Sequence, residues 1–356
     1  MKVLALNSSP RVGADSKTEW MLDHLLQGMA DAGAAVEAVA LKDRKIKLCR
    51  GCFTCWTKTP GTCILKDDMT SELLPKWMAA DLVVYASPLY HYTFNAQMKA
   101  FIERTLPILE PFLEEGADNR TDHSLRSDPP AAVVLSVAGF PEIAVFDQLS
   151  AYARFLFRET LRAEIYRPAA ESIAGEYMAD KRDAVAAAVR RAGAELIENG
   201  GISDDTMQCI TQPLGEDKTV FHTLGNLFWK TCIQEKVTPK EFQEKEMTPR
   251  PDSLETYMLI MQLGFNPGAA RELAAVMQFT FSGSVTGQCY LSIENGAITA
   301  AEGLHPSPQL TIAAPFDIWM DIITGKADGQ EMFMQQRYRV EGDFNLLMKL
   351  GEIFGR

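Results

Sequence analysis

The sequence predicts a doubly wound parallel α/β sheet over residues 1–200, a connector over 201–253 and an α+β domain over 254–356. Three observations lead to this fold class. The chain has 356 residues, more than one hydrophobic core usually organises. As far as Gly200, short aliphatic runs alternate with longer helical patterns, which is typical of crossover units on a parallel sheet. Beyond Ser253 the pattern changes to alternating strands with a hairpin signal, which predicts a second core.

The first domain is expected to contain five strands with crossover helices between them. The expected strands are Val3–Leu6, Val36–Leu41, Leu82–Ala86, Ala132–Val137 and Glu164–Arg167. A helix is expected between the first two, because apolar residues recur there at helical spacing and Gly33 ends the pattern. Its apolar face is expected to consist of Met21, Leu22, Leu25, Leu26 and Met29.

Composition and charge narrow the classes of function. Hydrophobic residues make up 47% of the chain and charged residues 23%, so we expect it to fold throughout. The formal net charge of -12 disfavours nucleic acid and anionic membranes as partners, because both would repel the protein. The apolar start at Met1–Asn7 is too short for a signal peptide, and no later run is long enough to span a bilayer. We therefore predict a cytoplasmic protein.

A polar loop follows the first expected strand and leads into a helix. Ser16 and Glu19 have the spacing of a capping box, so the helix N-terminus is expected to point at this loop. Backbone N–H groups, hydroxyls and Arg11 at such an end favour a dianionic phosphate. An ordinary capped helix with a surface arginine is the alternative that this loop by itself leaves open.

A second segment makes the prediction more specific. The third expected strand runs into residues 87–104, which begin Ser-Pro-Leu-Tyr-His-Tyr-Thr-Phe-Asn. Together with the first loop, this segment resembles the NADPH-dependent FMN reductase branch of the flavodoxin-like superfamily, over about the first 200 residues. The resemblance implies FMN as cofactor and NAD(P)H as co-substrate. It implies no catalytic acid or base, since the flavin supplies the chemistry.

The same resemblance implies which residues bind FMN. The residues expected to hold the phosphate are Ser9, Arg11, Ser16 and Thr18. The residues expected to surround the isoalloxazine ring are Pro88, Leu89, Tyr90 and His91 on one side and Ala138, Gly139 and Phe140 on the other. Tyr90 and His91 also fit an alternative in which they are half-buried loop residues with no ligand.

Four of the seven cysteines lie in one short loop after the second expected strand, at Cys49, Cys52, Cys55 and Cys63. Three thiols at CxxCxxC spacing, with a fourth after a Pro-Gly turn, resemble the loop of iron-sulfur flavoproteins, which implies a [4Fe-4S] cluster. Structural zinc more often uses two separated CxxC pairs and ranks lower, and a metal-free loop stays open. The loop is expected at the same sheet edge as the flavin, because it follows a parallel strand.

The strands of the second domain are expected to form an antiparallel sheet covered by helices. Phe279 and Phe281 share one side of a strand, and Asn295-Gly296 is a hairpin signal between two others. The connector before them is expected to contain short helices, since prolines interrupt it at Pro213, Pro239, Pro249 and Pro251.

The C-terminal stretch has the start and stop signals of two helices. Pro315 suits the first turn of one helix, Gly325 suits its end, and Asp343 suits the cap of the last helix. The last helix is expected to pack through Leu346, Leu347, Leu350, Ile353 and Phe354. From about Ser253 to Arg356 the chain resembles the sterol carrier protein fold, which implies an apolar tunnel. The methionines that fit either a tunnel or a plain core are Met320, Met332, Met334 and Met348.

These features predict an FMN-dependent NAD(P)H oxidoreductase or electron-transfer flavoprotein, with the cluster as a further redox centre. Its acceptor is expected to be a small molecule or a protein, and the C-terminal domain to bind an apolar ligand or acceptor. A homo-oligomer is also expected. Two alternatives stay open: a lipid- or quinone-binding carrier with a flavodoxin-like shuttle domain, and a thiol redox sensor that uses the four cysteines without metal.

Overall fold

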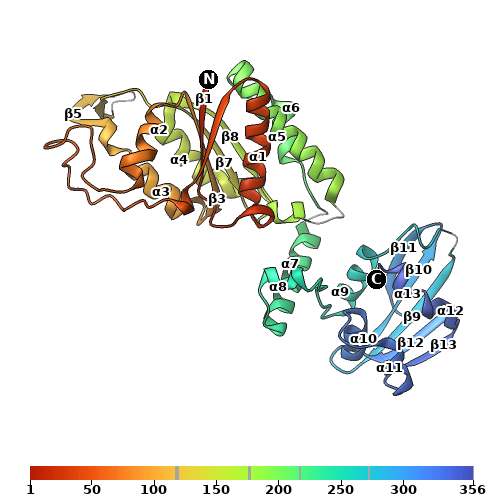
Figure 1. Cartoon of the computed structure of the whole chain (residues 1–356). Helices are drawn as coiled ribbons and strands as arrows, with labels where there is room; N and C mark the ends of the chain where they lie inside the picture. The colour runs from red at the N-terminus through yellow and green to blue at the C-terminus, as the bar shows by residue number, and fades with distance from the viewer. Residues whose placement is uncertain (117–119, 175–177, 216–217, 272, 356) are drawn as a thin grey trace. The chain divides into compact units, whose positions relative to one another are not determined.

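The chain forms two compact units, Met1–Glu216 and Asp217–Arg356. The computed structural model describes residues 1–116, 120–174, 178–215, 218–271 and 273–355 (Figure 1). The boundary between the units falls inside the segment expected as a connector, so α6 belongs to the first unit, and α7 and α8 to the second. The helices of this segment are α6 (Asp204–Thr211), α7 (Lys218–Glu235) and α8 (Pro239–Glu244).

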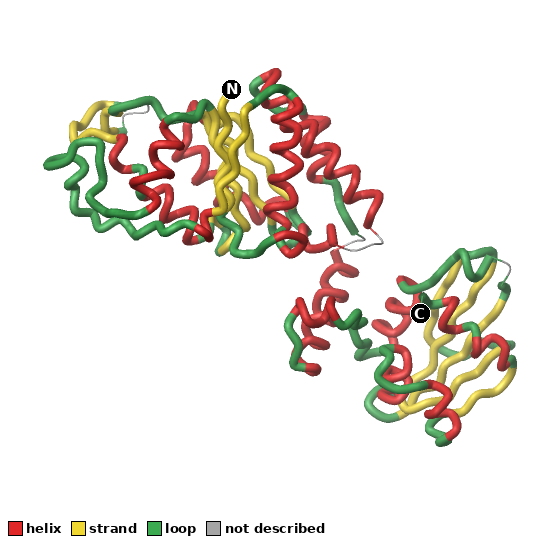
Figure 2. The backbone as a smooth tube through the Cα atoms, viewed as in Figure 1, coloured by secondary structure: helices red, strands yellow, loops and turns green. Residues whose placement is uncertain are grey.

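The first unit is built on a sheet whose strands are drawn in yellow in Figure 2. The parallel strands of this sheet have the order β2-β1-β3-β7-β8. Its strands are β1 (Lys2–Asn7), β2 (Ala35–Ala40), β3 (Leu82–Tyr90), β7 (Ala131–Val137) and β8 (Leu161–Arg167). All five expected strands are present, and the doubly wound fold class is confirmed. The winding direction reverses between β1 and β3, the place where doubly wound sheets bind ligands.

Helices cover both faces of this sheet (Figure 1). One face packs against α1 (Lys17–Asp31), α5 (Ala179–Asn199) and the end of α6, and the other packs against α2 (Leu74–Met78), α3 (Ala96–Glu103) and α4 (Asp147–Phe157). The expected apolar face of α1 is buried in the first of these cores. Glycines let α1 and α5 approach closely, since a Cβ built on Gly28 would lie 1.8 Å from the carbonyl oxygen of Arg190.

Three further strands of this unit were not expected from the sequence. The two-residue strand β4 (Thr93–Phe94) folds back on the end of β3, and β5 (Leu109–Glu115) pairs with β6 (Thr121–Leu125) as a separate two-stranded sheet. Phe112 and Leu113 in β5 are largely exposed, so the alternation that marks a half-buried strand is weak there.

The second unit contains a sheet with the order β11-β10-β9-β12-β13. Its strands are β9 (Ala275–Ser282), β10 (Gly287–Glu294), β11 (Ala297–Glu302), β12 (Leu310–Pro315) and β13 (Arg339–Gly342). The expectation of an antiparallel sheet is wrong for one pair, because β12 runs parallel to β9. The chain passes from edge strand β11 to the far side of β9, and the buried Gln278 side chain holds this passage through Gly303 O at 3.1 Å and His305 N at 2.8 Å.

The local signals of the second unit form as expected. Asn295 and Gly296 both have positive φ and make the tight β10–β11 turn. Pro315 directly precedes α10, and Gly325 follows the end of this helix with φ 75°. Asp343 caps α12 by accepting from Asn345 N at 2.8 Å. The helices are α9 (Leu254–Leu263), α10 (Phe316–Ile323), α11 (Gly329–Met334), α12 (Phe344–Met348) and α13 (Leu350–Ile353).

The expected last helix is thus divided in two at Lys349. Gly351, a weak helix former, lies in the second piece. The apolar face nevertheless packs as expected, with Leu346 and Ile353 buried and Leu347, Leu350 and Phe354 partly buried against the core.

No helix in the described ranges of the chain is long and apolar enough to cross a membrane.

Candidate functional site

The loop between β1 and α1 has buried hydroxyl groups at its two ends, which hydrogen bonds join to each other. Ser9 N donates to Asn7 Oδ1 at 2.9 Å, and Ser16 Oγ donates to Ser9 Oγ at 2.9 Å. Arg11 N in turn donates to Ser9 Oγ at 3.2 Å. Ser9, Ser16 and Thr18 are each at most 3% exposed. Two of the four residues expected at a phosphate, Ser9 and Ser16, are therefore bonded to each other in this loop, and Thr18 lies in the first turn of α1.

The N-terminus of α1 opens onto this loop. Ser16 is the N-cap and accepts from Glu19 N at 3.1 Å. The Glu19 carboxylate does not return to the amide of Ser16, as a capping box requires, but accepts from Gly13 N at 2.8 Å. Glu19 therefore closes the loop 7–16 back on the first turn of the helix.

Arg11, the fourth expected phosphate residue, lies at the rim of the loop. Its side chain is 54% exposed, and Nη1 forms an ion pair with Glu171 Oε1 at 2.7 Å. Glu171 follows β8, so the pair joins segments 160 residues apart. An exposed pair of this kind contributes about 0–1 kcal/mol, and a phosphate could displace the carboxylate at small cost.

The segment expected at the flavin ring forms the extended end of β3 and a tight turn. Pro88, Leu89 and Tyr90 lie in the strand, and β4 folds back on it so that Leu89 pairs with Phe94. His91 and Tyr92 make the turn with φ of 46° and 66°. Two consecutive non-glycine residues in this region are strained, and such strain occurs mostly at functional sites.

A side-chain hydrogen bond joins this second loop to the first. Asn95 Nδ2 donates to Ser8 O at 2.6 Å, while Asn95 Oδ1 accepts from Met98 N and caps α3. Tyr90 and His91 are exposed, not half-buried as the ligand-free alternative had them. Asn95 was given no role from the sequence, although its position before a helix is a common cap signal.

The third loop, after β7, lies at the same strand edge. Ala138 is buried and bonded on both sides, accepting from Ala170 N at 2.8 Å and donating to Arg167 O at 3.0 Å. Gly139 and Phe140 are exposed. The three loops expected at the flavin thus follow the carboxyl ends of β1, β3 and β7, which are neighbours in the sheet.

Arg167, at the end of β8, is a buried cation that the sequence did not single out. It donates to Pro168 O at 2.7 Å, to Gln212 O at 2.8 Å and to Ile210 O. Burial lowers the pKa of Arg167 to about 10. The charge of Arg167 is thus stabilised by backbone carbonyl groups at the end of α6 and not by a carboxylate. These hydrogen bonds attach residues 210–212 to the end of β8.

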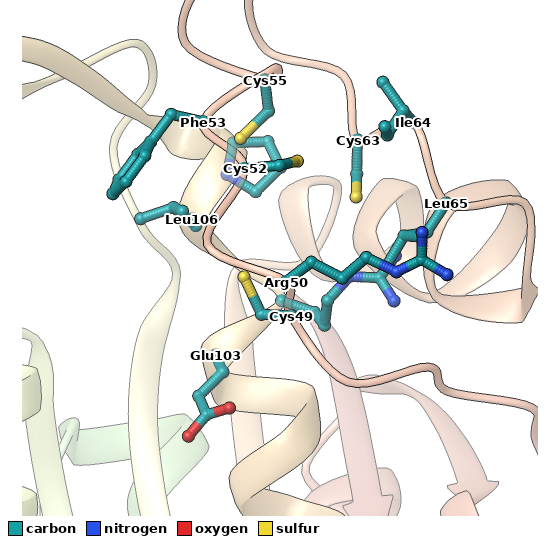
Figure 3. A pocket seen from close by; sticks show the side chains of 12 residues that line it. Cys49, Arg50, Cys52, Phe53, Cys55, Cys63, Ile64, Leu65, Glu103 and Leu106 are labelled. Atoms are coloured by element: carbon teal, nitrogen blue, oxygen red, sulfur yellow. The ribbon is translucent and has the colours of Figure 1, made fainter.

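The four cysteines of the loop line one pocket of about 360 Å³, including open solvent at its mouth. Figure 3 shows their sulfur atoms around a common space, with the Glu103 carboxylate turned away from it. Gly61, with φ 79°, donates to Cys55 O at 2.9 Å and so closes the expected Pro-Gly turn that brings Cys63 round. All four thiols are free. Among the described residues, no group of three His, Cys, Asp or Glu side chains could hold a metal ion as placed.

Two of the thiols differ in their tendency to ionise. A hydrogen bond from Thr54 Oγ1, 3.4 Å from the sulfur, lowers the pKa of the exposed Cys52. Burial raises the pKa of Cys55, and the neighbouring Cys63 thiol adds to the effect.

A buried ion pair supports the pocket. Arg104 donates from Nη1 to Asp67 Oδ2 and to Lys47 O, both at 2.7 Å, and from Nη2 to Asp67 Oδ1 at 3.1 Å and Thr70 Oγ1 at 3.0 Å. The two charged side chains are 1% and 0% exposed. Desolvation would raise the pKa of Asp67, but hydrogen bonds from Arg104 and Lys47 N hold it below its usual value.

The cysteine pocket is displaced from the strand edge where the sequence predicted it. Its lining includes Arg104, Leu106 and Pro107, which follow α3, whereas Asn95 at the start of α3 contacts the phosphate loop. An eight-residue helix is about 12 Å long. The loop leaves the carboxyl end of β2 and then runs along α3, because Trp56 Nε1 donates to Leu106 O at 3.2 Å and Arg104 holds Lys47.

Each of the two units contains a segment that matches a known protein family. Residues 1–161 match the family described as NADPH-dependent FMN reductase, and residues 262–355 match the SCP-2 sterol transfer family. The chain joins an FMN reductase domain to an SCP-2 domain. The match to the first family stops at the start of β8 and therefore includes all three loops and the cysteine pocket.

Relatives of the FMN reductase domain include iron-sulfur flavoproteins. One from Archaeoglobus fulgidus is 43% identical over 108 residues, which are 30% of this chain and 46% of that protein. One from Methanocaldococcus jannaschii is 32% identical over 108 residues, or 30% of this chain and 53% of that protein. The chain thus spans about half the length of these relatives. A solved NAD(P)H:quinone oxidoreductase from Methanothermobacter marburgensis aligns with 55% of this chain and 96% of its own, at 18% identity and a TM-score of 0.42.

The SCP-2 domain has an aromatic core. Tyr257 packs edge-on against Phe279 and Phe281, and its hydroxyl accepts from Trp319 Nε1 at 3.2 Å. Of the four methionines considered for a tunnel, Met320 is buried and Met332 partly buried in this core. Met334 and Met348 are 80% and 67% exposed, so they belong to the surface.

Proposed function

We propose that this protein is an FMN-dependent NAD(P)H oxidoreductase that passes electrons to a hydrophobic acceptor. The observation that carries the proposal is the meeting of three loops where the winding of the sheet reverses. Asn95 joins the ring loop to Ser8 of the phosphate loop, and Ala138 of the third loop is fixed by Arg167 O and Ala170 N. Sites at this edge are the usual ligand sites of doubly wound sheets.

The residues that would hold FMN follow from this arrangement. Ser9, Ser16 and Thr18 would surround the phosphate at the positive end of α1, and Arg11 would exchange Glu171 for it. The expected ring contacts are Pro88, Leu89, Tyr90 and His91, facing Ala138 and Gly139. When bound, the flavin accepts electrons from NAD(P)H and passes them on, so the protein's part is to bind and orient it.

The test of the flavin site compares the wild-type chain with Arg11→Ala. We expect FMN in the purified protein and an affinity lower by at least about tenfold in the variant, because a charge-assisted contact to the phosphate is lost. Fluorescence titration measures both affinities. NAD(P)H oxidation that depends on added FMN is the expected activity. A protein that neither contains nor binds FMN would contradict the proposal.

We further propose that the cysteine pocket holds a [4Fe-4S] cluster. In a cubane each thiolate binds a different iron, so four sulfurs that surround one space suit it. The buried Nε–H of Arg104, which has no partner among the described residues, supplies a donor beside this space. Anaerobic preparation should yield about four irons and four sulfides per chain. Zinc, or no metal after reconstitution, would reject the cluster.

One observation favours a thiol redox sensor as the second candidate. Cys52 is exposed, and its pKa is lowered, as a reactive thiol requires. In that case Cys52 should be the thiol that alkylates first in metal-free protein, and Thr54→Val should slow it. Reversible oxidation of Cys52 in a protein that takes up no iron would favour this candidate over the cluster.

We assign acceptor choice to the SCP-2 domain. A chain that ends at Gly215 should still bind FMN, because the sheet, α5 and α6 are then complete. A chain that ends at Gly200 loses α6 with the buried Ile210, so it should be less stable by about 2 kcal/mol or more. Comparing quinone reduction by the full chain and the Gly215 form at equal FMN content tests the assignment. Identical acceptor profiles would reject it.

A further inference from the structure

The buried guanidinium of Arg104 has one donor more than its partners use. A guanidinium carries five N–H groups. Four of them have partners: Lys47 O and Asp67 Oδ2 on Nη1, and Asp67 Oδ1 and Thr70 Oγ1 on Nη2. The fifth, on Nε, is buried and has no hydrogen-bond partner among the described residues. A buried donor without a partner lowers the stability of the fold by about 1–3 kcal/mol, so we expect an acceptor to lie near it in the functional protein.

The position of Arg104 indicates where that acceptor lies. Arg104 lines the pocket that the four cysteines surround. Cys63 lines the same pocket, so its thiol and the guanidinium of Arg104 border one space. The Nε of Arg126 also has no hydrogen-bond partner among the described residues, and that of Arg44 has only an ion pair with Glu72 Oε2 at 3.2 Å. The Arg44 and Arg126 side chains are 31% and 25% exposed and are not part of this pocket's lining.

We propose that Arg104 is a positioning residue for the iron-sulfur centre, whose Nε–H donates to the Cys63 sulfur once the loop is loaded. This inference rests on the proposed cluster. The ion pair with Asp67 fixes the guanidinium plane, so the direction of the Nε–H is set before any metal binds. A donor and a positive charge beside the ligating sulfur stabilise the form that has gained an electron. Arg104 therefore raises the reduction potential of the centre.

The test uses the full-length chain loaded anaerobically with ferrous iron and sulfide. Arg104→Lys keeps a cation opposite Asp67 but removes the Nε–H. Arg50→Lys is the matched control, because Arg50 lines the same pocket from an exposed position. We expect Arg104→Lys to lower the midpoint potential by about 59 mV, which is a tenfold change in the oxidised-to-reduced ratio for one electron. Arg50→Lys should leave the potential unchanged.

Three outcomes would overturn the inference. One is a loaded Arg104→Lys protein at the wild-type potential, and another is an equal shift in Arg50→Lys. If Arg104→Lys does not fold or load, pulsed EPR of the reduced wild-type and Arg50→Lys proteins, labelled with ¹⁵N-arginine, decides. A coupled arginine nitrogen in both supports Arg104, and its absence overturns the inference. If the wild-type chain forms no cluster, the proposed cluster itself fails.

Discussion

The phosphate loop, residues 7–16, buries its hydroxyls and bonds them to each other, whereas the cysteine loop, residues 44–68, leaves Cys52 exposed and rests on one buried ion pair. In the first loop the contacts among Asn7, Ser9 and Ser16 are neutral and join residues at most seven positions apart. In the second, Arg104 joins α3 to Asp67 across 37 residues, and it leaves one N–H unused. The two sites of one domain are thus held in shape by different means.

From this difference we infer which of the two loops has polar groups that only a ligand would satisfy. The Ser9 and Ser16 hydroxyls of the first loop have hydrogen-bond partners within the chain, so we expect FMN to add contacts to a loop that is already held in shape. The cysteine loop contains free thiols and an unpaired donor, so its ligand would satisfy groups that the chain leaves unsatisfied. We expect substitutions beneath the cysteine loop to cost mainly stability, and substitutions in the phosphate loop to cost mainly affinity.

The largest effect is expected from Asp67→Ala. It leaves the Arg104 charge buried and unpaired, so the FMN reductase domain should lose about 3–5 kcal/mol of unfolding free energy. Denaturant titration of the full chain, followed by tryptophan fluorescence, measures the loss. The control is Glu103→Ala, which breaks the exposed pair with Lys99 and should cost at most about 1 kcal/mol. Similar losses in the two variants would contradict the role given to Asp67.

The same pair should make the domain sensitive to acid. The pKa of Asp67 is lower in the folded chain than in the unfolded one, so its contribution is complete above the unfolded value of about 4 and is lost as pH falls through the folded value. The stability difference between wild type and Asp67→Asn should therefore shrink in acid. Melting temperatures at a series of pH values below 6 test this, and a constant difference would rule it out.

A smaller effect is expected from Ser16→Ala in the phosphate loop. Losing the cap of α1 should cost about 1 kcal/mol, and losing the hydroxyl should weaken FMN binding by about tenfold. Ser203→Ala is the matched control, because Ser203 caps α6 in the same way but lies outside the loop. It should lower stability without changing the FMN affinity measured by fluorescence. An equal loss of affinity in both would show that the caps act only through stability.

The smallest effect is expected from Glu171→Gln. It releases Arg11 from its ion pair, so FMN should bind up to about fivefold more tightly. The gain in FMN affinity should disappear in the Arg11→Ala background, because Glu171 then has no ion pair with Arg11 to lose. A tighter-binding Glu171→Gln protein whose gain persists without Arg11 would mean that Glu171 acts on the phosphate directly.

Patterns within a few residues of each other were predicted well. The alternation of apolar runs with helical segments is enough for the five parallel strands, since each strand and crossover helix has its own period. Ser16, Asn295-Gly296 and Asp343 mark a cap, a turn and a cap, because these residue types satisfy local backbone groups. The spacing of Cys49, Cys52, Cys55 and Cys63 places four thiols in one loop.

Pairings between distant segments were not predictable in the same way. Arg11 is a candidate phosphate residue by sequence, but its ion pair with Glu171 appears only when β8 lies beside the first loop. The parallel pairing of β12 with β9 requires the segment between β11 and β12 to cross the sheet. The buried Gln278 side chain stabilises that segment by accepting a hydrogen bond from His305 N.

The sequence by itself therefore determined the two folds, the helix-capped loop and the set of four thiols, because local spacing encodes local geometry. Only the tertiary structure decided that the thiols lie along α3, away from the strand edge, over the buried pair of Arg104 and Asp67. Neither charge carries a local signal for its partner 37 residues away. Their pairing results from packing, because packing removes water from both side chains and each charge is then stabilised by the opposite charge of the other.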